Sequence, residues 1–217
     1  MFINDGDTVC IVGGGPGGSA CAMVLLQEAR KLDRKIRVVL IEHKIFSEHR
    51  HYNQCIGVLS PPFEDILKND LDLTLPDNLV LDNMEGYCLH SDLLSLDLVG
   101  KESGRSVSVT RSNFDAFMLE EARKAGAEIV HNRVTAIEVN SDGVVIYTEG
   151  DNFKIAVVVG AFGLDDGTCR IFEQGTPYCQ PDFLNTVITR LYPGKEFMQS
   201  MGSTIHAFLL SHPGLEF

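Results

Sequence analysis

A glycine cluster near the N-terminus has the spacing that binds the pyrophosphate of a dinucleotide. The segment from Gly13 to Gly18 reads GGGPGG and satisfies the pattern G-x-G-x-x-G. The first glycine of such a pattern allows a tight turn, the second lets backbone approach a pyrophosphate, and the third lets a helix pack closely on a strand. The N-terminus of the following helix supplies free N–H groups and partial positive charge for the phosphates.

An acidic residue follows at the distance expected for a ribose ligand. Glu42 lies 24 residues after Gly18, at the end of an apolar segment. A carboxylate there accepts hydrogen bonds from the ribose hydroxyls of an adenosine and repels a 2′-phosphate. The two features together predict FAD or NAD rather than NADP, and they do not choose between FAD and NAD.

The elements that must position these residues are all adjacent in sequence. The segment Thr8–Val12 is typical of a parallel strand that is buried on both faces. The pattern of residues 19–32 predicts a helix, and that of residues 36–41 predicts a second strand. Pro16 suits the first helical turn, where its missing N–H is not needed. The alternative is a glycine-rich turn without a ligand. The continuous order of strand, glycines, helix, strand and acid argues against it.

Downstream elements favour an FAD domain over a plain six-strand NAD domain. Residues 112–125 predict an amphipathic helix with Ser112 as N-cap and Gly126 as C-cap, followed by a parallel strand over 127–131. Strands over 134–139, 144–148 and 153–159 predict a three-stranded meander, because Asn140-Ser-Asp-Gly143 is a strong hairpin signal.

Three segments resemble a known superfamily of flavoproteins. Arg111-x-x-Phe114-Asp115-x-x-x-Leu119 resembles the R-x-x-F-D-x-x-L helix of the superfamily that holds aromatic hydroxylases, halogenases and geranylgeranyl reductases. Val-Val-Val-Gly-Ala-Phe-Gly, over 157–163, resembles its V-V-G-A-D-G strand end. Cys55-Ile-Gly57 resembles the C-x-G segment typical of geranylgeranyl reductase-like enzymes. The resemblance covers about residues 8–170.

The resemblance implies a set of site residues. It places glycines and a proline at the pyrophosphate, Glu42 on the adenosine ribose, Arg111 near the ribityl or pyrophosphate part, and the backbone of Val134 against the adenine. Cys55 and Gly57 are the candidate catalytic residues, near the isoalloxazine. The full set expected to bind FAD is Gly13, Gly15, Pro16, Gly17, Gly18, Glu42, His43, Arg111 and Val134.

Two departures from the superfamily pattern stand out. Phe162 stands where the motif usually has Asp, and no G-D-A-like second flavin motif follows residue 170. Because family members are about twice as long, the chain is expected to be an N-terminal portion that stops inside the substrate domain. The predicted fold is α/β, a Rossmann-like FAD-binding ββα domain with a three-stranded crossover meander, plus the beginning of an antiparallel substrate-domain sheet. The expected FAD domain comprises residues 1–75 and 111–170, and the partial substrate domain residues 76–110 and 171–217.

Several reactive residues also have ordinary structural interpretations. Cys55 is alternatively a small buried hydrophobe, and Arg111 a surface cation. The cluster His49, Arg50 and His51 is more typical of a solvated loop than of a phosphate contact. Asp165 and Asp166 are expected in a turn. No metal-ligand spacing and no Ser/His/Asp grouping is evident. Toward the C-terminus, strands are expected over 183–191 and 203–211, with a short helix over 195–201.

Composition excludes several function classes. Thirty acidic against eighteen basic residues give a net charge of −12, which disfavours nucleic acid as a partner. Local charge is −8 over 64–102 and +4 over 30–50. Both runs are typical of solvated faces, although the basic one could help to hold an anionic cofactor. The absence of a long apolar segment or leader predicts a cytoplasmic protein, and the six cysteines fit reduced thiols.

The predicted function is that of an FAD-dependent oxidoreductase of the geranylgeranyl reductase-like group. By that resemblance, reduced flavin delivers hydride to a carbon–carbon double bond of a prenyl-type lipid. The expected partners are a small-molecule or lipid substrate, an electron donor such as NAD(P)H or ferredoxin, and a peripheral membrane contact. Two alternatives stay open: an NAD(P)H-dependent flavin monooxygenase, and a dinucleotide-binding module without catalysis.

Overall fold

The computed structural model describes residues 3–46, 55–98, 106–183, 185–189, 191–209 and 211, which form two compact units. Unit 1 comprises residues 1–53 and 112–185, and unit 2 comprises residues 54–111 and 186–217. Residues 54–75 fall in unit 2, although they were expected in the FAD domain. The pairing of β3 (Val58–Leu59) with β7 (Ser106–Val109) ties this segment to unit 2. The functional assignment of the two units stays a prediction.

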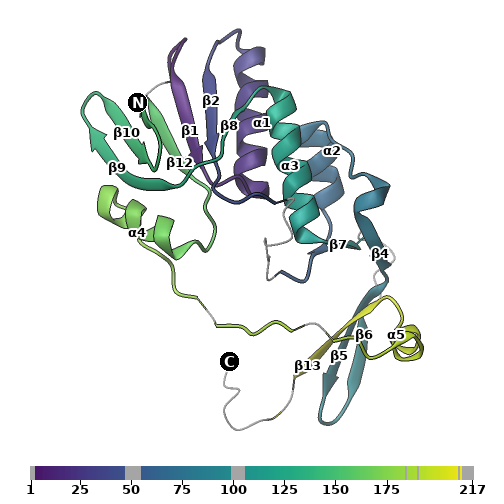
Figure 1. Cartoon of the computed structure of the whole chain (residues 1–217). Helices are drawn as coiled ribbons and strands as arrows, with labels where there is room; N and C mark the ends of the chain where they lie inside the picture. Colours follow the sequence, from purple (N-terminus) through teal and green to yellow (C-terminus); the bar gives the residue numbers. More distant parts are fainter. Residues whose placement is uncertain are drawn as a thin grey trace. The chain divides into compact units, whose positions relative to one another are not determined.

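Unit 1 is built on a four-stranded parallel sheet in the order β12-β1-β2-β8. The strands are β1 (Thr8–Val12), β2 (Arg37–Ile41), β8 (Glu128–Val130) and β12 (Val157–Gly160). Four of the five residues in each of β1 and β2 are buried, as expected for central parallel strands covered on both faces. Helix α1 (Pro16–Lys31) packs against β1 and β2 (Figure 1).

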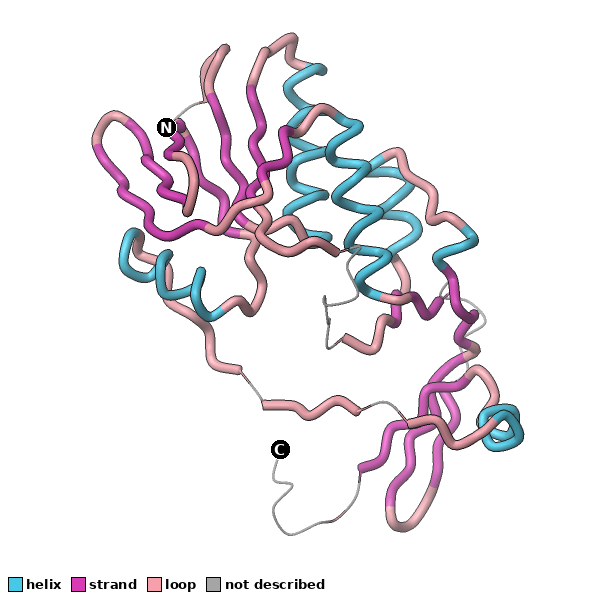
Figure 2. The backbone as a smooth tube through the Cα atoms, in the orientation of Figure 1, coloured by secondary structure: helices cyan, strands magenta, loops and turns pink. Residues whose placement is uncertain are grey.

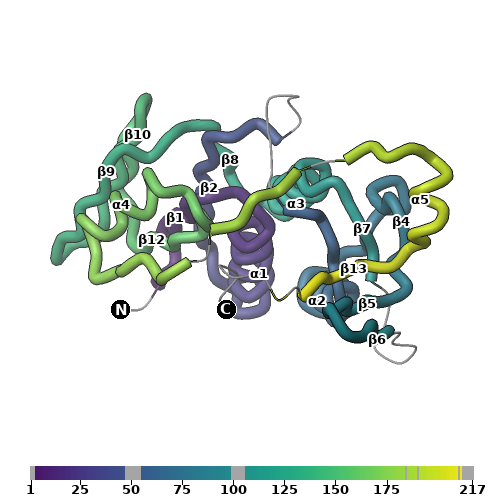
Figure 3. Tube along the Cα trace, turned by 90° about the horizontal axis from the view of Figure 1, so that it is seen from below, coloured from purple at the N-terminus to yellow at the C-terminus, as the bar shows by residue number. Residues whose placement is uncertain are grey.

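A three-stranded antiparallel meander covers the other face of this sheet. Strands β9 (Val134–Asn140), β10 (Gly143–Thr148) and β11 (Asn152–Ile155) pair in the order β11-β10-β9. Their apolar side chains join those of β1 and β2 in one core, so that the meander and α1 lie on opposite sides of the sheet (Figure 3). The core members are Cys10, Val12, Val39, Ile41, Val134, Ile137, Val144, Ile146, Ile155 and Phe172. The predicted meander is therefore confirmed.

The third predicted meander strand divides into two. Residues 153–159 were expected as one strand, but β11 ends at Ile155 and β12 begins at Val157. The backbone N–H of Ala156 donates to the carbonyl of Thr8, which starts the parallel pairing of β12 with β1. The segment therefore contributes to two sheets, because β11 pairs with β10 and β12 pairs with β1.

Two helices complete unit 1. Helix α3 spans Arg111–Ala125, so it begins one residue before the predicted N-cap Ser112, and Gly126 follows it at φ +111° as the predicted C-terminal glycine. Helix α4 spans Asp166–Gly175 and packs on β9. Asp165 and Asp166, which were predicted to lie in a turn, instead begin this helix.

The described residues of unit 2 form two small sheets and three helical segments. Strand β7 pairs antiparallel with β3 and with β4 (Val80–Met84), beside α2 (Phe63–Leu71) and the 3₁₀ turn Asp77–Leu79. The second sheet has the order β13-β5-β6, from β5 (Gly86–Ser91), β6 (Ser95–Leu98) and β13 (Thr204–Leu209). Strands β5 and β6 pair antiparallel. Strand β13, which was expected to begin an antiparallel sheet, instead pairs parallel with β5.

The C-terminal predictions are partly correct. Helix α5 (Lys195–Met201) and strand β13 match the predicted helix and strand. The strand predicted over 183–191 is wrong where the chain is described, since those residues form a loop (Figure 2). All six cysteines are free thiols. In the described part of the chain, none of the helices combines the length and the apolar character needed to cross a bilayer.

Candidate dinucleotide site

Two glycines of the fingerprint are required by the fold itself. Gly13 has φ +110°, and a Cβ there would lie 2.4 Å from the carbonyl oxygen of Ala161. A Cβ on Gly18 would lie 1.9 Å from the carbonyl oxygen of Gly13. The first position therefore needs glycine for its turn, and the last needs it for close approach of α1 to the loop. These are the structural tasks that the pattern predicts.

Two other glycines of the loop, Gly15 and Gly17, have no such reason within the chain. An ideal Cβ on Gly15 or Gly17 would meet no atom within 4 Å, and neither residue has a positive φ. Both positions could accept alanine without a clash or backbone strain. The sequence pattern predicts a pyrophosphate in the open space beside them.

The N-terminus of α1 is suited to an anion. Pro16 occupies the first helical turn as predicted, and Gly15 is the N-cap residue, from which no side-chain capping hydrogen bond is possible. The first turn contains no acidic residue. The positive end of the helix dipole therefore lies beside the glycine loop, and no acidic side chain of the first turn opposes an anion there.

Glu42 is held by the backbone on both sides. Its side chain is 7% exposed; Oε2 accepts a hydrogen bond from the N–H of Gly14 at 2.8 Å, and Oε1 accepts one from the N–H of Lys44 at 2.8 Å. A carboxylate offers about four lone-pair sites, so acceptor capacity remains for ribose hydroxyls. The carboxylate therefore lies at the end of β2 in the place that the sequence predicts for a ribose ligand.

His43 is a neutral neighbour of this carboxylate. Its Nδ1 lies 3.4 Å from Oε1 of Glu42. Burial lowers the pKa of His43 below its ordinary value; the charges of Glu42 and Asp165 oppose this shift, and those of Arg133 and Lys44 add to it. The lowered pKa means that His43 is uncharged at neutral pH, so its contact with Glu42 is not an ion pair.

A pocket opens beside Glu42 at the carboxyl ends of β1 and β2. Val134, predicted to face the adenine, is buried at the start of β9 and lines this pocket. The complete lining is Val12, Gly13, Ile41, Glu42, His43, Lys44, Asn132, Arg133, Val134, Phe162, Asp165 and Thr168. Ligands of open parallel sheets bind in this position, outside the carboxyl ends of the strands.

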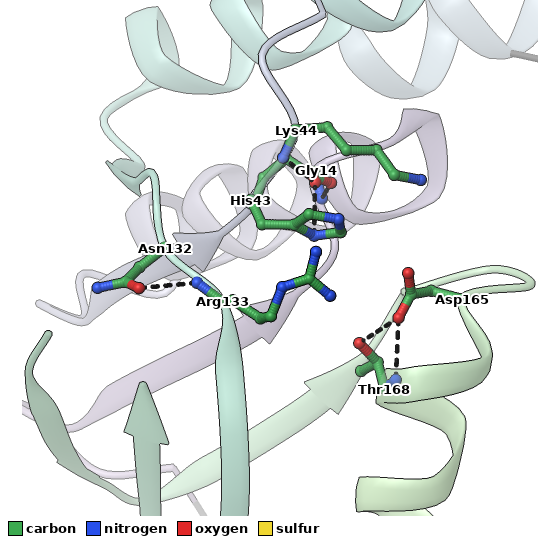
Figure 4. Close-up of polar contacts among 8 residues, drawn as sticks. Gly14, His43, Lys44, Asn132, Arg133, Asp165 and Thr168 are labelled. Atoms are coloured by element: carbon green, nitrogen blue, oxygen red, sulfur yellow. Dashed lines mark hydrogen bonds and ion pairs between the residues drawn. The ribbon is translucent and has the colours of Figure 1, made fainter. Parts of the chain in front are cut away.

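Two cationic residues, Arg133 and Lys44, line the pocket. Lys44 belongs to the basic run over 30–50, whereas Arg133 was not expected at the site. In Figure 4 the Arg133 side chain extends toward the His43 ring, and Asp165 lies across the pocket. Arg133 directly precedes Val134, in the loop that joins β8 to β9. Its place next to a predicted adenine contact is the sequence feature that could have indicated it. Two cations beside a buried carboxylate make a pocket suited to a nucleotide, which carries phosphates together with ribose hydroxyls.

Asp165 caps α4 at the edge of the pocket. Its Oδ1 accepts hydrogen bonds from the Thr168 N–H at 2.9 Å and from the Thr168 hydroxyl at 2.8 Å (Figure 4). Burial alone would raise the pKa of Asp165, but these hydrogen bonds and the nearby His43 and Lys44 bring it below its ordinary value. The residue is therefore an ionised N-cap.

Phe162 has a packing role in place of the aspartate expected from the superfamily motif. Its ring lies 4.6 Å from that of Phe172 and 5.7 Å from that of Tyr178, measured between centroids. An aromatic cluster thus anchors α4 and the following segment beside the end of β12. The departure from the motif is explained by this apolar contact.

Three predicted site residues lie in unit 2, as the two units are divided. Arg111 begins α3 and is half-buried. Gly57 has φ +80°, and a Cβ there would lie 2.0 Å from the carbonyl oxygen of Val109, so glycine is required by the fold. Cys55 is exposed, which makes its interpretation as a buried hydrophobe wrong, and its Sγ accepts from the Gly57 N–H at 3.4 Å. Their flavin contacts stay predictions. His49, Arg50 and His51 lie outside the described residues.

Comparisons with known proteins place this architecture among flavoproteins. No family model matches the chain. It is 28% identical to the FixC protein of Escherichia coli strain K12 over 167 residues, which are 71% of this chain and 36% of that protein. The chain therefore spans about a third of the length of this curated relative.

Solved structures agree on the fold. A geranylgeranyl bacteriochlorophyll reductase-like protein from Thermoplasma acidophilum aligns with a TM-score of 0.58 and 22% identity, over 78% of this chain and 42% of that one. The halogenase PltM, solved in complex with phloroglucinol and FAD, aligns with a TM-score of 0.59 and 19% identity, over 76% of this chain and 36% of that one. The chain has the Rossmann-type fold of these FAD-binding flavoproteins, and the predicted fold class is confirmed.

Proposed function

We propose that unit 1 binds FAD, with the pyrophosphate at the N-terminus of α1 and the adenosine ribose on Glu42. The observation that carries the proposal is the contrast among the glycines. Gly13 and Gly18 are explained by packing, whereas Gly15 and Gly17 face open space at an uncapped helix N-terminus. A pyrophosphate that lies close to the backbone of these two residues would leave no room for a side chain, which explains why both are glycine.

The pocket residues fit the adenosine half of this cofactor. Glu42 keeps acceptor capacity beyond its two backbone hydrogen bonds, and its charge disfavours a 2′-phosphate. Val134 supplies an apolar surface for the adenine, and Arg133 and Lys44 compensate phosphate charge. FAD is preferred to NAD because the meander β9-β10-β11 belongs to the FAD-domain plan, and because a structural neighbour was solved with FAD.

We further propose an oxidoreductase activity of the geranylgeranyl reductase-like kind. Bound FAD in its reduced form supplies a hydride, here for a carbon–carbon double bond of a prenyl-type lipid. The chain's own residues bind and orient the cofactor: the glycine loop positions the pyrophosphate, and Glu42 the ribose. Cys55 and Gly57 are proposed near the reacting face, Arg111 near the ribityl or pyrophosphate part, and NAD(P)H or ferredoxin as electron donor. The proposed setting is cytoplasmic with a peripheral membrane contact.

A second candidate function is oxygen-dependent flavin chemistry. Halogenases are among the structural neighbours, with TM-scores equal to that of the reductase-like protein or slightly higher. The two functions separate on one property of the loaded protein. A double-bond reductase consumes its reduced flavin with a prenyl acceptor under anaerobic conditions, whereas a monooxygenase or halogenase requires oxygen.

The cofactor proposal is tested by visible absorption after adding FAD and removing the excess by desalting. We expect the purified chain to retain flavin bands and Gly17→Ala to lose them. Gly167→Ala is the matched control, because Gly17 and Gly167 are each the second residue of a helix without a positive φ. Flavin retained equally by both variants would remove the glycine loop from the cofactor site. If the two variants and the unmodified chain all lose the flavin bands, the proposal that this chain binds FAD is wrong.

A further inference from the structure

Three side chains with metal-ligand chemistry meet on one face of the sheet β13-β5-β6. Cys88 and His90 are two residues apart on β5, so they point to the same face, and His206 is paired in register with Cys88 from β13. One ligand atom from each of the three lies within 4.8 Å of the others. Cys88 is buried, and the two histidines are half-buried. Figure 1 shows the three strands side by side.

The two imidazole rings are already oriented by hydrogen bonds on their outer nitrogens. Nε2 of His206 lies 3.4 Å from the carbonyl oxygen of Met201, which can only accept. His206 Nδ1 is therefore the acceptor at 2.8 Å from His90 Nε2, and His90 Nδ1 in turn lies 2.8 Å from the Ser95 hydroxyl. Histidine ligands of metals have this arrangement, with one nitrogen toward the metal and the other held by a carbonyl or similar partner.

The neighbouring strand β6 offers a carboxylate beside the cluster. Asp97 on β6 is paired in register with Cys88. Residues directly opposite each other on neighbouring strands share a face of the sheet, so Asp97 lies on the same face as the cluster. Sulfur, two imidazole nitrogens and a carboxylate or water form a donor set typical of zinc.

We propose that Cys88, His90 and His206 form a Zn²⁺ site. A tetrahedral zinc with bonds of about 2.0–2.1 Å to nitrogen separates two such nitrogens by about 3.3 Å. The inner nitrogens lie 2.8 Å apart, so a small ring displacement admits the ion. Binding replaces the thiol proton of Cys88, which leaves to solvent, with a metal–sulfur bond. The proton on His90 Nε2 moves to Nδ1, from which it donates to Ser95.

The site would join two distant parts of the chain. His90 and His206 are separated by 116 positions, and β13 reaches β5 only in the folded protein. Bound zinc would therefore tie β13 to the β5-β6 hairpin and stabilise unit 2 against unfolding. The alternative is a hydrogen-bonded histidine pair that needs no metal.

The test uses the full chain without an affinity tag, stripped with a chelator and then titrated with ZnCl₂ against a chromophoric zinc indicator. We expect one equivalent bound per chain, with release of about one proton and an increase in the thermal unfolding temperature. Titration with CoCl₂ should produce a sulfur-to-cobalt charge-transfer band. Failure of the unmodified chain to compete with the indicator for zinc would overturn the proposal.

Variants assign the ligands. Cys88→Ser and His206→Gln should each weaken zinc at least about 100-fold, since the loss of an outer partner alone costs about 10- to 100-fold. Cys88→Ser should also abolish the charge-transfer band. Cys179→Ser and His131→Gln are matched controls, because both residues are exposed and outside the cluster. Equal losses in the controls would refute the assignment.

A further variant guards against misfolding of the ligand variants. Ser95→Ala keeps all three ligands and removes only the hydroxyl beside His90 Nδ1. Circular dichroism should report a native fold, and zinc affinity should fall by about 10-fold or more. Unchanged affinity in a folded Ser95→Ala chain would contradict the assignment of His90 as a ligand.

Discussion

The backbone N–H of Gly14 donates a 2.8 Å hydrogen bond to Oε2 of Glu42. This contact joins the fingerprint loop to the acidic residue at the end of β2, two features separated by 28 positions. A Cβ on Gly14 would lie 2.8 Å from the Cβ of Glu42, so the approach itself depends on glycine. The loop and the ribose ligand are therefore one structural unit, and a change in either affects the other.

Glu42→Ala tests this unit directly. We expect FAD to bind about 1–3 kcal/mol more weakly, because a buried hydrogen-bonding partner of the ribose is lost. The N–H groups of Gly14 and Lys44 also lose their acceptor, so stability should fall as well. Flavin fluorescence titration gives the affinity, and urea unfolding gives the stability. Unchanged affinity would remove Glu42 from the site.

Neighbouring glycines should respond in opposite ways to alanine. Gly18→Ala places a methyl group against the Gly13 carbonyl and should destabilise the fold by about 1–3 kcal/mol or more. Gly17→Ala, one residue earlier, meets open space and should stabilise α1 by about 0.5–1 kcal/mol. Urea unfolding of the chain without cofactor measures both. If both substitutions change the free energy of unfolding equally, the close contact between Gly18 and the Gly13 carbonyl does not determine the need for glycine.

The lowered pKa of His43 predicts a loss of stability in mild acid. Above its ordinary value of 6.5 the side chain is neutral whether the chain is folded or unfolded. As the pH falls below 6.5 the unfolded chain binds the proton first, so stability decreases toward the folded pKa. His43→Gln should flatten this dependence. The comparison of urea unfolding at about pH 7.5 and about pH 5.5 measures the slope.

The exposed histidine His131 is the control for this experiment. His131→Gln should retain the acid-side slope of the unmodified chain. A slope that survives in His43→Gln would mean that another group carries the pH dependence.

Cys55→Ala should leave flavin binding and folding unchanged and alter turnover. The thiol is exposed, so its removal creates no cavity. Flavin retention and thermal unfolding report the first expectation. The second is measured anaerobically, as the rate at which a lipid bearing a geranylgeranyl group reoxidises the reduced, loaded protein. If Cys55→Ala fails to fold, Cys55 is a core residue, contrary to its exposed position.

The order β1, glycine loop, α1 and β2 was predictable because its causes are local. A β-branched run forms β1, Pro16 fits the first helical turn, and the positive φ of Gly13 requires glycine. The hairpin signal before Gly143 likewise predicted the meander, since turn residues determine the connection. Each of these preferences acts within a few residues, and the sequence records them directly.

Tertiary structure alone decided which distant residues meet. Residues 153–159 split between two sheets because Ala156 bonds to Thr8, and the predicted strand over 183–191 did not form in the described residues because it found no partner strand there. Arg133 joined the pocket through a β8-β9 connection that carries no motif.

Cys88 and His206 illustrate the same limit most clearly. Nothing in their local sequences indicates that they lie opposite each other, because strand pairing and register are set by the packing of the whole unit. The sequence by itself determined the elements and the fingerprint that it carries. The fold decided the pocket around Glu42 and the cluster on β5 and β13, since these depend on contacts between residues far apart in the chain.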